Sequence, residues 1–108
     1  MQLDAIEETH IFQALADETR FRIMRLLLAA ERPARAGELA VALDVEPSHL
    51  TRHLQILQFA KLITVHRNGR VKMVGALSDE GNIDLVTAAV KKMSDRSGLL
   101  AKDLVRLL

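Results

Sequence analysis

The spacing of apolar residues along the first thirty positions predicts two helices. Between residues 3 and 16, apolar side chains recur every three or four positions, which is the spacing of an amphipathic helix. Phe12 lies outside that stripe, so this helix is expected to make contacts on two sides. From residue 18, apolar side chains cover most of the helical circumference, with Asp17 as the expected N-cap. This second segment is therefore predicted to be a central buried helix, with its arginines (Arg20, Arg22 and Arg25) solvated or paired.

A helix-turn-helix is predicted to follow, between residues 38 and 59. Residues 31–37 are expected to form a loop, because Pro33 and Gly37 disfavour a helix. The segment ELAVAL indicates a short helix, and a second helix begins at Pro47, whose missing N–H would have no helical partner in the first turn. The turn of about four residues between them holds Asp44, which tolerates the left-handed conformation better than most residues do.

The apolar period changes to two after Leu62, which predicts a β-hairpin. Asn68-Gly69 is the strongest short hairpin signal in the chain, because both residues of such a turn need positive φ. These elements together predict one winged helix-turn-helix domain over residues 1–108. It is expected to be mainly α, with about five to six helices and a small two-stranded β-hairpin as the wing.

The pattern predicts further helical sequence after the hairpin. It starts at residues 78–80 and continues with apolar positions at Ile83, Val86, Val90 and Met93, and residues 94–98 interrupt it. Whether the sequence beyond residue 80 forms one kinked helix or two stays open. Leucine and valine recur from residue 99 to residue 108, and a domain this small would cover them poorly. An oligomer interface, shared with the first helix, is therefore expected at this end of the chain.

Charge is distributed unevenly along a chain whose net charge is only +1. Residues 47–77 hold five of the fifteen lysines and arginines and none of the fourteen acidic residues. The rest of the chain therefore carries ten cations against fourteen acids. A nearly neutral protein with one locally basic surface fits a specific polyanion contact better than general adhesion to polyanions.

The second helix of the helix-turn-helix has one face suited to nucleic acid. Leu50, Leu54 and Leu57 share one side, and hydroxyl, guanidinium and amide groups share the other. Such groups hydrogen-bond base edges and phosphates. An arbitrary polar helix face is usually only solvated, but the helix-turn-helix and the acid-free surroundings favour DNA binding here. The candidate DNA-binding residues are Ser48, His49, Thr51, Arg52 and Gln55 on the helix, and Arg67, Asn68, Gly69, Arg70 and Lys72 on the wing.

Two assignments within this set have alternatives. His49 flanks the polar face and fits either a contact or a solvated role, whereas His53 lies beside the leucines and is expected to be packed and hydrogen-bonded. The basic wing is expected to hold phosphates, although charge also protects an exposed sheet edge from pairing with another chain. The neighbouring polar helix favours the phosphate contact.

Composition excludes several classes of function. The chain has no cysteine, so disulfides, thiolate metal sites and thiol redox sensing are excluded. No apolar run approaches the ~18 residues that span a membrane, and residues 1–8 lack the basic start of a signal peptide. A cytoplasmic protein without membrane association is expected. No catalytic motif occurs at useful spacing, so an enzyme is not expected.

Several segments together resemble the ArsR/SmtB family of bacterial winged-helix repressors. They are FQALADETRFRIMRLLL, GELAVAL, PSHLTRHLQIL with AKLI, and HRNGR, and they cover roughly residues 11–77. The most specific pieces are LADETRFRI and the distance from SHLTRHL to the wing. The resemblance implies a homodimer, with residues 1–16 and 79–108 as dimerisation helices, that binds a palindromic operator in double-stranded DNA. It also implies release of the DNA when an effector binds, commonly a metal or metalloid.

The chain departs from the metal sites of that family. Thiolate sensors carry a cysteine pair where this chain reads GELAVAL, and the alanines there cannot bind metal. The family's other site uses Asp and His ligands along the penultimate helix, which here has no histidine. A divalent metal effector would have to use Glu7, His10, Asp84 or Asp95, and paired carboxylates suit hard cations rather than zinc or nickel. Lys61 also stands where the family usually has glycine.

Two classes of function remain in competition. The first is a dimeric DNA-binding transcriptional repressor of the ArsR/SmtB type. The second is a winged-helix protein–protein interaction module that does not bind DNA. The acid-free polar face favours the first, because an interaction module has no need to keep it. The effector, the operator sequence and the regulated genes are not determined by the sequence.

Overall fold

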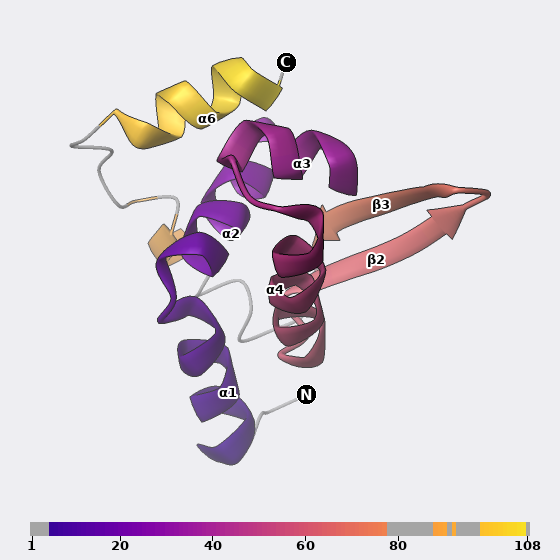
Figure 1. Cartoon of the computed structure of the whole chain (residues 1–108). Helices are drawn as coiled ribbons and strands as arrows, with labels where there is room; N and C mark the ends of the chain where they lie inside the picture. The colour runs from indigo at the N-terminus through magenta and orange to yellow at the C-terminus, as the bar shows by residue number, and fades with distance from the viewer. Residues whose placement is uncertain (1–4, 78–87, 91, 93–97, 108) are drawn as a thin grey trace.

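The computed structural model describes residues 5–77, 88–90, 92 and 98–107, with only the backbone described for residues 5–8. Its elements are α1 (Ala5–Leu15), α2 (Glu18–Ala30), β1 (Ala34–Arg35), α3 (Ala36–Leu43), α4 (Pro47–Phe59), β2 (Ile63–Asn68), β3 (Val71–Ala76) and α6 (Leu99–Leu107). The helices pack together, and the β2–β3 hairpin projects away from them as a wing (Figure 1). The predicted mainly α, winged helix-turn-helix fold is confirmed.

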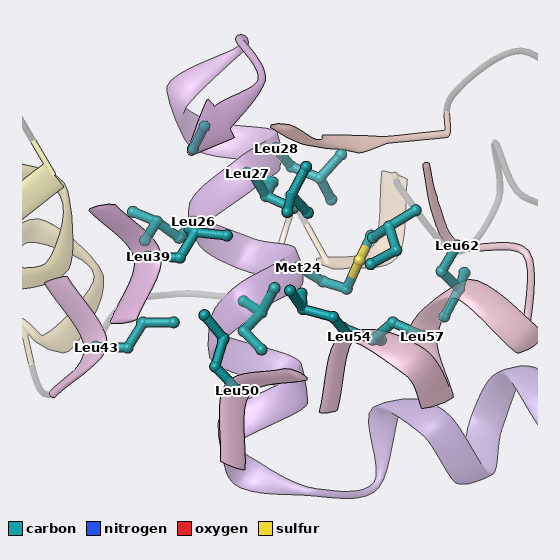
Figure 2. Close-up of a cluster of buried hydrophobic side chains, with 14 of the residues drawn as sticks. Met24, Leu26, Leu27, Leu28, Leu39, Leu43, Leu50, Leu54, Leu57 and Leu62 are labelled. Atoms are coloured by element: carbon teal, nitrogen blue, oxygen red, sulfur yellow. The ribbon is translucent and has the colours of Figure 1, made fainter. Parts of the chain in front are cut away.

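Helix α2 is the centre of the hydrophobic core. Ile23 and Leu26 have no exposed surface, and Met24, Leu27 and Leu28 are also buried. Leucines from α3 and α4 converge on this helix in Figure 2. The helix begins where the sequence predicts, because the Asp17 carboxylate accepts a hydrogen bond of 3.1 Å from the backbone N–H of Arg20.

The helix-turn-helix consists of α3, a short turn and α4. Asp44 adopts the left-handed conformation (φ 56°, ψ 52°), as the sequence predicts. The N–H of Val45 donates to the carbonyl of Ala40 at 3.0 Å, and that of Asp44 donates to Val41 at 3.2 Å. These two bonds form a Schellman motif, which satisfies the last carbonyls of α3 before α4 begins at Pro47.

The wing belongs to a three-stranded sheet rather than to an isolated two-stranded hairpin. The strand order is β1-β3-β2, and Ala34 and Arg35 pair with Val74 and Met73 of β3. The predicted two-stranded wing is present as β2 and β3, but the expectation of a loop over residues 31–37 was wrong, because Ala34–Arg35 adds a third strand to the sheet. Ala34 is completely buried, and its burial places the backbone of β1 against the free edge of β3, where both can form hydrogen bonds.

The start of α3 was also predicted too late, because Gly37 lies inside the helix. The Glu38 side chain accepts a hydrogen bond of 3.1 Å from the backbone N–H of Arg35, the residue before the helix. This bond satisfies a donor that precedes the helix and offsets the low helix propensity of glycine.

The hairpin turn lies one residue further along than the sequence predicts. Asn68 pairs with Val71, so the two loop residues are Gly69 and Arg70 instead of Asn68 and Gly69. Gly69 has a φ of 67°, whereas neither Asn68 nor Arg70 has positive φ. A turn with glycine first, and positive φ only there, has the character of type II′, which suits the twist of the strands as well as the expected type I′ turn does.

The C-terminal helix α6 packs on α2 and α3 through polar as well as apolar contacts (Figure 1). Asp103 is completely buried and accepts two hydrogen bonds from the Arg22 guanidinium, at 2.8 and 3.3 Å. Arg106 donates to the carbonyl of Val41 in α3 at 2.7 Å. Leu107 is buried, so this end of the chain is covered better than expected, although Val105 is 72% exposed.

Some expectations lie outside the described residues. They concern the helix start at residues 78–80 and the apolar positions Ile83, Val86 and Met93; Val90 is described and is buried. Among the helices that the structure describes, none is both long and apolar enough to cross a membrane.

Removing the buried acid of α6 should destabilise the fold. Asp103→Ala would leave the Arg22 guanidinium half-buried without its carboxylate, and we expect a loss of about 3 kcal/mol in the free energy of unfolding. The double variant Arg22→Met, Asp103→Leu removes both charges and should lose clearly less. Urea unfolding of the three proteins measures the difference. Equal losses in the single and double variants would mean that packing, not charge pairing, holds α6.

Candidate nucleic-acid interface

Three leucines seat helix α4 on the core. Leu50, Leu54 and Leu57 are 2%, 1% and 0% exposed, and they point into the apolar cluster around α2 (Figure 2). Because they occupy one stripe of the helix, the opposite stripe must face outwards. Helix α4 is therefore a rigidly seated element that presents its polar face to solvent.

The structure places the predicted polar residues on that outer face. Ser48, His49, Arg52 and Gln55 are exposed, and Thr51 is half-buried. The Thr51 hydroxyl donates to the carbonyl of Pro47 at 3.0 Å, so its proton is engaged while its oxygen can still accept a hydrogen bond. The side chains of Arg52 and Gln55 supply the donors and acceptors that match base edges in a major groove.

A polar contact on the inner side of α4 links it to two other helices. The Arg20 Nη1 atom lies 3.2 Å from His53 Nδ1, and Arg20 Nε donates to the carbonyl of Ala14 at the end of α1, at 2.6 Å. A guanidinium can only donate hydrogen bonds, so His53 Nδ1 is the acceptor in this contact. His53 is thus packed and hydrogen-bonded, as the sequence predicts, and Arg20 joins α1, α2 and α4.

The Asp17 carboxylate lies beside Arg20 and His53, and Arg20 favours its ionised form. Partial burial would raise the pKa of Asp17, but the backbone N–H and the guanidinium charge of Arg20 lower the pKa below its usual value. The Asp17 Oδ2 atom lies 3.8 Å from His53 Nδ1. The carboxylate is therefore favoured over the neutral acid in the folded state.

Stability should consequently fall in acid. A carboxyl whose folded-state pKa is lowered contributes stability above its unfolded pKa of about 3.9, and this contribution disappears as the pH falls through the folded pKa. Asp17→Asn keeps an oxygen for the N-cap but removes the titration. We expect the free energy of unfolding of this variant to fall less steeply between pH 5 and pH 3 than that of the unmodified chain. Parallel slopes in urea unfolding would contradict the assignment.

The wing presents a cationic surface without acids. Arg67, Asn68, Gly69 and Arg70 are exposed around the turn, and Lys72 is half-buried. Arg67 and Lys72 are direct cross-strand partners. Like charges directly opposite each other destabilise a hairpin, and no acidic residue lies anywhere between Pro47 and Leu77 to offset this. The arrangement is suited to an anion, which would relieve the repulsion.

Comparisons with known proteins agree with this geometry. A helix-turn-helix domain family matches residues 15–66. The transcriptional repressor SdpR of Bacillus subtilis is 33% identical over 61 residues, which make up 56% of this chain and 66% of the repressor. The crystal structure of an ArsR family transcriptional regulator is 29% identical, with a TM-score of 0.65, over 82% of this chain and 90% of that one. Together these similarities support an ArsR/SmtB-type winged-helix transcriptional regulator.

A further solved structure supports the fold over most of the chain. HlyU from Vibrio cholerae is 24% identical with a TM-score of 0.67, over 82% of this chain and 97% of that one. The curated repressor SdpR is matched over just under two thirds of its own length.

Of the four candidate metal-ligand side chains, only that of His10 lies within the described residues. The His10 ring lies 5.5 Å from the Phe59 ring, in a tilted aromatic contact. The Glu7 side chain, Asp84 and Asp95 lie outside the described residues. Among the side chains that are described, no group of three or more His, Asp or Glu could hold a metal ion.

Helix α4 ends at a left-handed residue that is not glycine. Lys61 has a φ of 60°. Its N–H donates to the carbonyl of Gln58, and the N–H of Leu62 donates to that of Leu57, both at 3.0 Å. These bonds form a second Schellman motif, which directs the chain from α4 into the wing. The chain therefore leaves α4 along the path that a terminal glycine would give, although Lys61 has a Cβ and occupies the left-handed region.

Restoring glycine at this position should stabilise the protein. A side chain in the left-handed conformation costs about 1–2 kcal/mol, and glycine loses about 0.4–1 kcal/mol through the entropy of the unfolded chain. Lys61→Gly should therefore raise the free energy of unfolding by about 0.5–1 kcal/mol. Lys61→Ala removes the same charge but keeps the Cβ, so it should show no such gain. An equal gain in both variants would assign the effect to charge.

Proposed function

We propose that this ArsR/SmtB protein is a sequence-specific repressor that binds a palindromic operator as a homodimer. The observation that carries the proposal is the polar face of α4, seated by three buried leucines and flanked by an acid-free cationic wing. In this arrangement, α4 enters the major groove, where Arg52 and Gln55 meet base edges. The wing holds the neighbouring phosphates through Arg67, Arg70 and Lys72. Genomic DNA as the partner implies a cytoplasmic location.

Exposed apolar side chains on the flanking helices support the homodimer. Phe12 of α1 is 68% exposed and Val105 of α6 is 72% exposed, although both helices also pack against the core. A second copy would cover these positions through the dimerisation segments, residues 1–16 and 79–108. A two-fold dimer presents two α4 helices, so its operator should contain two inverted half-sites one helical turn, or a multiple of one turn, apart.

Two substitutions should separate base recognition from phosphate binding. Arg52→Ala should cost about 1–3 kcal/mol on the preferred operator and relax the preference at the contacted base pair. Arg70→Ala should weaken binding to all sequences alike and reduce the slope of log affinity against log salt by about 1. Fluorescence anisotropy with the selected operator and with scrambled duplexes measures both effects.

Lys102→Ala provides a control, because Lys102 is an exposed cation on α6, outside the α4 and wing residues. Since it lies in a proposed dimerisation segment, sedimentation of the variant first checks that its oligomeric state is unchanged. The variant should change neither the sequence preference nor the salt slope. If the protein binds no duplex even at low salt, the interaction-module alternative replaces the repressor. If it binds but neither Arg52→Ala nor Arg70→Ala has an effect, DNA contacts a different surface.

A further inference from the structure

A basic hollow lies between α3 and the wing and extends the predicted interface, because two of its cations, Arg70 and Lys72, already belong to that interface. It is about 430 Å³ in volume and lies between the first turn of α3 and the start of β3. Its lining combines Arg35, Ala36, Gly37 and Glu38 with Arg70, Val71 and Lys72 of the wing. The pairing of Arg35 with Met73 joins the two sides of the hollow through the sheet. The sequence alone could not show this, because residues 31–37 had no predicted strand.

The charges of the hollow favour an anion. Arg35 and Arg70 are exposed, and Lys72 is half-buried next to them. The single acid of the lining, Glu38, already accepts from the N–H of Arg35 at 3.1 Å and lies 3.6 Å from the guanidinium of Arg32. Three cations therefore line the hollow against one acid that is already engaged.

The ligand of the hollow must also match the cationic surface that surrounds it. Lys72 faces Arg67 across the wing, so the cationic surface continues from the hollow to the hairpin turn and the far strand. A single phosphate could not contact both ends of such a surface, whereas the sugar–phosphate backbone of a duplex presents a charge at regular short intervals.

We propose that this hollow binds the DNA backbone flanking the half-site, with Arg35 as a phosphate contact that the α4–wing surface does not include. The inference rests on the proposed function, which it extends from two contacting elements to three. The β1–α3 junction then touches the same strand of DNA as the wing does. A contact of this kind adds affinity without sequence information.

Two kinds of variant test phosphate binding in the hollow: one removes a positive charge, and the other adds a negative charge. Arg35→Gln removes the proposed phosphate partner at an exposed position. Gly37→Glu adds a negative charge, and Gly37→Gln is its matched neutral control. A Cβ at Gly37 would meet no atom within 4 Å, so both side chains fit. An acid in the first turn also favours the helix, so Gly37→Glu should not unfold the protein while it repels phosphate.

Each variant is measured on a long duplex and on one cut back to the two half-sites. Losing one phosphate contact lowers the salt slope by about 0.9, which corresponds to about eightfold weaker binding near 0.1 M salt. On the long duplex we expect this loss for Arg35→Gln, and at least as large a loss for Gly37→Glu relative to Gly37→Gln. On the short duplex the unmodified protein should lose affinity, and Arg35→Gln should bind like the unmodified protein.

The outcomes separate this inference from the proposed function. If Arg70→Ala weakens binding while Arg35→Gln and Gly37→Glu match their controls on the long duplex, the hollow does not bind DNA and the inference is wrong. An equal effect of Arg35→Gln on both duplexes would also overturn it, because the contact would then lie within the half-site. If Arg52→Ala and Arg70→Ala have no effect either, the proposed α4–wing surface is wrong as well, and if the unmodified protein binds no duplex at low salt, the proposed function fails.

Discussion

The burial of helix α2 is the constraint on which the rest of the structure depends. Its apolar side chains cover most of its circumference, and α1, α3, α4, α6 and β3 all pack against it. Close packing around one helix restricts the position and orientation of each neighbouring element. The outward direction of the polar face of α4 is therefore a consequence of Leu50, Leu54 and Leu57 filling the core beneath it. The position of the proposed DNA-contacting side chains follows from apolar packing.

Arginines of α2 add directional contacts to this apolar packing. Arg20 connects the end of α1 to His53 on the inner side of α4, and Arg22 holds the buried Asp103 of α6. Arg25 lies over the Phe21 ring, 5.4 Å from its centre. Apolar contacts tolerate small shifts, whereas a guanidinium requires its acceptors in defined places. The segments proposed to form the dimer are thus connected to the element proposed to contact DNA through side chains of a single helix.

The sequence by itself determined the elements whose signals are local. The helical periods, the Asp17 N-cap, the start of α4 at Pro47, the left-handed Asp44 and the inner position of His53 were all predicted correctly, because each depends on neighbours within about one helical turn. The polar face of α4 was also predicted from the sequence, because the leucines on the opposite side of the helix follow the helical period. The absence of acids from residues 47–77 required only composition.

Only the tertiary structure decided the features that join distant residues. Strand β1 forms because Ala34 is buried and β3 offers a free edge, and neither condition is visible around Pro33. The shift of the turn to Gly69 and Arg70 follows the register of β2 against β3, which a turn signal alone does not set. The Arg22–Asp103 pair joins residues 81 positions apart, and the basic hollow joins the start of α3 to the wing. Such features depend on packing between segments, whereas sequence periodicity reports on one segment at a time.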